Sequence, residues 1–123
     1  ILWPAWSEPR TGSAFAEVSR RHGDFAIAAA AAQVALDGDG RCVRASFGIG
    51  GGGSTPRAFP ELATRLIGSR LEAVVVTGVA HDAAAGVDFS SDLHARADYR
   101  RHLAAVLVAR ALRAAHEHAK SKV

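Results

Sequence analysis

The chain has 123 residues, 49% hydrophobic and 22% charged, which is typical of one globular domain rather than a disordered chain. Its formal net charge is only +3 and its basic residues are scattered, which argues against direct nucleic-acid binding. No apolar run approaches the ~20 residues of a membrane span, and the single cysteine, Cys42, is expected to be a small strand residue in a cytoplasmic protein.

The N-terminal region is expected to be extended. The absence of methionine, even at position 1, and the opening ILWPAW predict a fragment of a longer polypeptide. Residues 1–12 carry two prolines and Gly12, so we expect a lead-in segment with turns. Ser13 to Ser19 places apolar Phe15 and Val18 among polar neighbours, which predicts a short strand.

The alanine-rich run from Ala26 to Leu36 presents a conflict. Alanine is the best helix former, yet the run leads directly into DGDGR, Asp37 to Arg41, a strong hairpin signal. The residues after this turn, CVRASFGI, alternate as a strand does and need a partner. We therefore predict two long antiparallel strands. The small alanine side chains are expected because helices pack closely over this strand.

Three helical segments are candidates for the second half. A helix is predicted from about Pro60 to Ile67, with Gly68 as its stop. The segment from Leu71 to Ala85 fits strand or helix. After the polar loop DFSSDLHARA, a long helix runs to about Ala119. Its predicted buried stripe comprises Tyr99, Leu103, Val106, Leu107, Ala111 and Leu112.

This order of elements predicts an α+β fold for one domain, residues 1–123. The expected architecture is a two-layer sandwich, with a three- to four-stranded, mainly antiparallel sheet in 13–50 and three helices in 56–120. One face of the sheet would be covered and the other would be free to meet another surface.

A glycine-rich stretch, FGIGGGGSTP, permits a different interpretation. Gly48, Gly50 and Gly53 formally match G-x-G-x-x-G, but glycine density alone produces such matches, and the acidic residue of a dinucleotide site is absent. A small nucleotide-binding βαβ module using Gly48 to Gly53 remains the alternative. A strand at Leu71 to Ala85 would favour that module, and a helix there would oppose it.

The six histidines and the carboxylates predict no metal or catalytic site. His116 and His118 are two positions apart on a predicted helix and point in different directions. His81 with Asp82, and His94 with Asp92 and Asp98, have no nucleophile beside them in a defined turn. We therefore predict no self-sufficient catalytic constellation, which also leaves open a free-standing interaction domain.

Three stretches nevertheless carry a family resemblance over almost the whole chain. They are SAFAEVSRRHGDFAIAAAAAQVALDGDGRCVRAS, GIGGGGSTPRA and SDLHARADYRRHLAAVLVARAL. In order and spacing they resemble the C-terminal domain of the FAD-binding (medium) subunit of molybdenum hydroxylases, of the carbon monoxide dehydrogenase and xanthine dehydrogenase type. The chain resembles only the third domain of such subunits, so we expect it to bind no FAD alone.

The resemblance also implies roles for particular residues. It places Phe15, Phe47 and Ile49 in the flavin-ring environment of the full subunit, with Phe47 at a strand end outside the central core. Arg20, Arg21 and Asp24 would form an interdomain charge cluster. The implied partners are the N-terminal FAD-binding domains, an iron-sulfur small subunit with [2Fe-2S] clusters, and a large subunit with the molybdenum cofactor. Electrons would pass from these clusters to FAD and a final acceptor.

Overall fold

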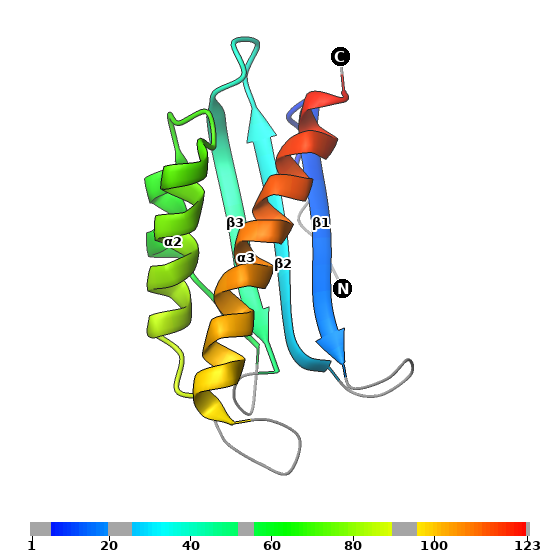
Figure 1. Cartoon of the computed structure of the whole chain (residues 1–123). Coiled ribbons are helices and arrows are strands. Elements are labelled where there is room, and N and C mark those ends of the chain that lie inside the picture. Colours follow the sequence, from blue (N-terminus) through cyan, green and yellow to red (C-terminus); the bar gives the residue numbers. More distant parts are fainter. Residues whose placement is uncertain (1–5, 20–25, 52–55, 90–95, 123) are drawn as a thin grey trace.

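The computed structural model describes residues 6–19, 26–51, 56–89 and 96–122. In chain order the elements are β1 (Arg10–Ser19), β2 (Ala26–Leu36), β3 (Cys42–Gly50), β4 (Arg57–Ala58), α1 (Pro60–Ala63), the short 3-10 helix η1 (Thr64–Leu66), α2 (Ala73–Ala85) and α3 (Ala97–Lys120). The strands form one sheet in the order β1-β2-β3-β4, and α2 and α3 lie over one of its faces (Figure 1). The predicted α+β sandwich is confirmed. Within the described ranges, no helix is long and apolar enough to span a membrane.

The alanine-rich run is a strand, as predicted. β2 pairs antiparallel with β1 on one side and with β3 on the other. The turn that joins β2 to β3 explains why helix propensity is overridden. The Asp37 carboxylate accepts hydrogen bonds from the backbone N–H groups of Asp39 and Arg41, both at 2.9 Å, and Gly40 adopts a positive φ of 85°, which glycine tolerates.

Small residues set the distance between the sheet and α3. Ala28 and Ala30 of β2 are 0% and 1% exposed beneath the helical layer. At Gly12 of β1 the approach is closer, because an added Cβ would lie 2.3 Å from the Ala115 carbonyl oxygen and 2.3 Å from the Ala119 nitrogen. The prediction that helices pack close over thin side chains is therefore confirmed.

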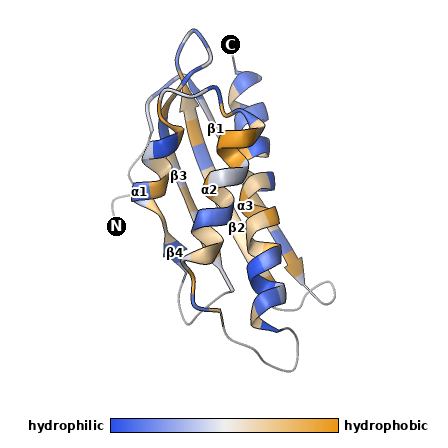
Figure 2. Cartoon of the chain, turned by 60° about the vertical axis from the view of Figure 1, so that its left-hand side comes forward, coloured by the Kyte–Doolittle hydropathy of each residue, from blue (hydrophilic) through white to orange (hydrophobic). Residues whose placement is uncertain are grey.

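The segment from Leu71 to Ala85, which was ambiguous in sequence, contains helix α2. Its Val76, Val79 and Ala80 are fully or almost fully buried. Figure 2 shows few polar residues in α2 and many in α3. Since β3 pairs antiparallel with β4 and a helix occupies the place of the required second strand, the βαβ nucleotide module is wrong.

The buried stripe of α3 differs from the predicted one. Leu107 and Leu112 are fully buried, as expected, but Tyr99 and Val106 are 49% and 39% exposed. The stripe instead includes Ala104 beside Leu107 and Leu112, and the predicted Leu103 is only partly buried. The prediction at Tyr99 and Val106 assumed that large apolar side chains face the sheet. The sheet is lined by small residues at close range, and alanine fits against it better than tyrosine does.

Two boundaries also differ from the expected ones. β1 begins at Arg10, within the predicted lead-in. The first helical segment ends at Leu66, and Ile67 is extended and 46% exposed. Gly68, with φ of 83°, donates its N–H to the Cys42 carbonyl oxygen at 2.7 Å, so the chain turns back to β3 before Ile67 can continue the helix.

Candidate functional site

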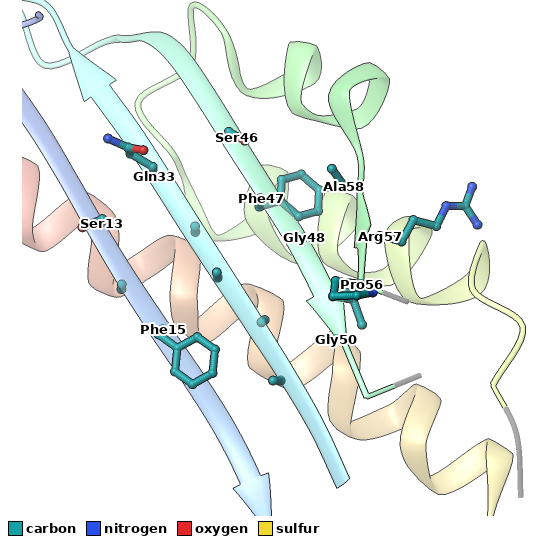
Figure 3. A pocket seen from close by; sticks show the side chains of 16 residues that line it. Ser13, Phe15, Gln33, Ser46, Phe47, Gly48, Gly50, Pro56, Arg57 and Ala58 are labelled. Carbon is teal, nitrogen blue, oxygen red and sulfur yellow. The ribbon is translucent and has the colours of Figure 1, made fainter. Parts of the chain in front are cut away.

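The sheet face opposite the helices carries a groove, and the Phe15 ring lines one side of it. We call this surface the open face, and its residues alternate along three strands: Ser13, Phe15, Glu17, Ala29, Ala31, Gln33, Ser46, Gly48 and Gly50. Strand register places Phe15, Ala31 and Gly48 side by side, with Ala58 of β4 next in the row. They line a groove of about 750 Å³ (Figure 3), a volume within the usual range of small-molecule sites.

The floor of the groove is flat because its residues lack long side chains. Ala31 is exposed between Phe15 and Gly48. A Cβ at Gly48 would lie 2.8 Å from the Arg57 carbonyl oxygen, so the close passage of β4 requires glycine here. The floor therefore presents backbone and methyl groups to any ligand.

A polar row borders this apolar row. Ser13, Gln33 and Ser46 are paired across β1, β2 and β3 and line the same groove. The motif analysis did not identify Gln33 or Ser46. Ser13 lies two residues before Phe15 and therefore on the same face of β1. Once the strand register is known, Gln33 and Ser46 follow as its neighbours across the sheet.

The structure separates the three residues expected near a flavin ring. Phe15 is 65% exposed on the open face, whereas Phe47 and Ile49 are 4% and 3% exposed on the helix-covered side. The Phe47 ring stacks on Phe59, with ring centroids 5.5 Å apart. The expectation that Phe47 lies outside the core is wrong, since its neighbour Gly48 takes the open-face position.

The N-terminal segment lies against one end of the open face. The Arg44 guanidinium lies 4.2 Å from the centroid of the Trp6 ring and 3.6 Å from a Glu8 carboxylate oxygen. Ala35, the β2 partner of Arg44, lies on the open face but is fully buried. The chain preceding β1 therefore approaches from the side of the groove.

The predicted charge cluster of Arg20, Arg21 and Asp24 lies outside the described residues, as do Asp92 and His94.

Several of the described polar side chains form structural contacts. His118 Nδ1 accepts a hydrogen bond from the Ser13 backbone N–H at 3.0 Å. Arg65 donates to Asp82 at 2.6 Å, and this hydrogen bond lowers the pKa of the Asp82 carboxyl. Burial raises the pKa of the Cys42 thiol, which favours the unreactive protonated form. Among the described residues, no three His, Cys, Asp or Glu side chains could together hold a metal ion.

Similarity to known proteins agrees with this architecture. The chain is 42% identical over 102 residues to the 6-hydroxypseudooxynicotine dehydrogenase complex subunit alpha of Paenarthrobacter nicotinovorans, covering 83% of this chain and 34% of that subunit. It is 34% identical over 110 residues to the carbon monoxide dehydrogenase medium chain of Afipia carboxidovorans, covering 89% and 38%. The chain thus spans little more than a third of these relatives.

A solved structure shares the fold. A carbon monoxide dehydrogenase from Hydrogenophaga pseudoflava that lacks the Mo-pyranopterin moiety of its molybdenum cofactor superimposes with a TM-score of 0.86 and 28% identity, over 94% of this chain and 39% of that chain. A family model described as CO dehydrogenase flavoprotein C-terminal domain matches residues 13–115. The chain therefore belongs to the CO dehydrogenase flavoprotein C-terminal domain family.

Proposed function

We propose that this chain is the C-terminal domain of the flavoprotein subunit of a molybdenum-containing hydroxylase or dehydrogenase, and that its open face helps to enclose FAD. The observation that carries the proposal is the exposed Phe15 ring beside a flat floor of Ala31 and Gly48. The names of the relatives, a medium chain and a complex subunit alpha, support a place in a multisubunit oxidoreductase.

The groove fits a planar aromatic ring. A floor without long side chains allows close approach, and a Cβ at Gly48 would disturb the strand that borders it. Phe15 supplies an aromatic surface for dispersion contact and would exclude water from the ring. Phe47 and Ile49 are buried behind the floor of the groove. Their proposed role is to hold β3 in place, without contact between their side chains and the ring.

The described residues of this chain provide an environment rather than reacting groups. FAD would supply the electron-transfer chemistry, accepting electrons from [2Fe-2S] clusters that are reduced by a molybdenum cofactor in partner subunits. The Trp6 and Arg44 contact brings the preceding segment to the open face, so FAD-binding domains joined there could reach the groove. Arg20, Arg21 and Asp24 are proposed to contact those domains.

Ring binding by the isolated chain tests the proposal. Lumiflavin is an isoalloxazine with a methyl group in place of the ribityl, diphosphate and adenosine portion of FAD. It is titrated into the 15N-labelled chain, with FAD in a parallel titration. We expect weak, millimolar binding of both ligands, with amide shifts at Phe15, Ala31 and Gly48, because pyrophosphate-binding domains are not part of the chain. Phe15→Ala should weaken lumiflavin binding several-fold by loss of aromatic contact, whereas Val74→Ala, at an 85% exposed position on α2, should not.

Two results would contradict the proposal. One is the absence of any lumiflavin-dependent shift on the open face of the wild-type chain. The other is tight, stoichiometric binding of FAD by the isolated chain, which would require a pyrophosphate site within these residues.

A further inference from the structure

The open face is asymmetric about the Phe15 row. On one side lies the row of Ser13, Gln33 and Ser46, and on the other lies the row of Glu17, Ala29 and Gly50. Rows on the same face of a strand are about 6.7 Å apart. A ring system of three fused rings centred on Phe15 would therefore extend toward both neighbouring rows.

The chemistry of these rows differs in a way that matches the two ends of an isoalloxazine. One end of the ring is an apolar dimethylbenzene, and the other is a pyrimidine that presents a carbonyl, an N–H and a second carbonyl along one edge. A glutamine amide can accept from that N–H and donate to an adjacent carbonyl at the same time. Serine hydroxyls can also donate to carbonyls.

Gln33 is available for this contact. It is half-buried in the groove wall, and Figure 3 shows its amide in the wall of the groove that also includes the Phe15 ring. Within the part of the chain that the structure describes, neither the Gln33 amide nor the Ser46 hydroxyl forms a hydrogen bond to another residue.

The opposite row suits the apolar end. Ala29, which is only 9% exposed, and Gly50 are small and apolar, and the polar side chain of this row, Glu17, is an exposed carboxylate at the sheet edge. An ionised carboxylate is an acceptor only, so it could receive the pyrimidine N–H but would repel the carbonyls on both sides of it.

We propose that Gln33, flanked by Ser13 and Ser46, binds the pyrimidine edge of the flavin and thereby determines which way the ring lies on Phe15. This inference rests on the proposed function, because it assumes that the open face receives the flavin ring. It assigns Gln33 as an orientation-determining binding residue, with the dimethylbenzene end over Ala29 and Gly50.

The test compares lumiflavin with 3-methyl-lumiflavin, which lacks the pyrimidine N–H. Dissociation constants for both ligands are measured by NMR titration with the wild-type chain, Gln33→Met and Glu17→Met. We expect methylation to weaken wild-type binding by about two- to tenfold, the effect of one lost hydrogen bond. Gln33→Met should lose affinity for lumiflavin by a similar factor and show no further effect of methylation, whereas Glu17→Met should retain the full methylation effect.

Each other outcome has a definite meaning. An equal methylation effect in the wild type and Gln33→Met, its disappearance in Glu17→Met, or its absence in the wild type would overturn the assignment of Gln33. If lumiflavin still binds and Phe15→Ala still weakens it, the proposed function survives that failure. Absence of lumiflavin binding to the wild-type chain would overturn both. Thermal unfolding of each variant checks that these surface substitutions leave the fold intact.

Discussion

Replacement of Gly12 by alanine tests the contact between β1 and α3 that sets the spacing of the two layers. The added Cβ would lie 2.3 Å from the Ala115 carbonyl oxygen, 2.3 Å from the Ala119 nitrogen and 2.9 Å from the Ala119 Cα. All three are backbone atoms of one helix, so no side-chain rotation can relieve the overlap. Since ordinary contacts begin near 3.4 Å, α3 would have to move by about 1 Å.

The structure provides a matched control for the backbone effect of the same substitution. At Gly38, in the turn between β2 and β3, an added Cβ would have no heavy atom within 4 Å. Gly→Ala at a compatible position stabilises a protein by roughly 0.4–1 kcal/mol, because it restricts the unfolded chain. Gly38→Ala should therefore be neutral or slightly stabilising.

Gly12→Ala should instead lower the free energy of unfolding by about 3 kcal/mol, the upper end of overpacking costs, because rigid backbone must yield. That is a large part of the roughly 5–15 kcal/mol by which a domain is stable. Urea unfolding followed by far-UV circular dichroism measures both variants. A difference below about 0.5 kcal/mol, the usual range of surface substitutions, would refute the direct packing of α3 on the β1 backbone.

Two further predictions follow from burial and charge. Phe47→Ala should lower the free energy of unfolding by about 3–5 kcal/mol, because it removes a buried ring stacked on Phe59, whereas Phe15→Ala should change it by less than about 0.5 kcal/mol; similar losses in urea unfolding would contradict the assignment of the two faces. Burial, and then the charge of Lys120, lower the pKa of His116 below its ordinary value of 6.5. As the pH falls, His116 is therefore protonated in the unfolded chain before it is protonated in the folded chain. The stabilisation that is present above pH 6.5 is lost as the pH drops from 6.5 toward the lower pKa of the folded state. His116→Gln should show a shallower loss of stability between about pH 7 and pH 5, and an unchanged slope would be inconsistent with the lowered pKa.

The candidate site could be only partly predicted from sequence. The motifs around Phe15 and Phe47 suggested a flavin environment, but alternation alone does not say which face of a strand the helices will cover. The Phe15 position proved to be open, and the Phe47 position is buried against Phe59. Gln33 became visible only when strand register placed it between Ser13 and Ser46, since side chains distant in sequence meet through pairing.

What the sequence determined by itself was local. The Asp37 to Gly40 turn and the alternating strand after it required Ala26 to Leu36 to be extended, because a hairpin strand needs a hydrogen-bonded partner. The tertiary structure decided the segment from Leu71 to Ala85, whose apolar residues fit either period, and it rotated the buried stripe of α3 away from Tyr99. For α3 the deciding term was close packing on a sheet of alanine and glycine, where methyl groups at short range fit better than larger apolar side chains. For the segment from Leu71 to Ala85 it was the burial of Val76, Val79 and Ala80 in a helix that packs against α3.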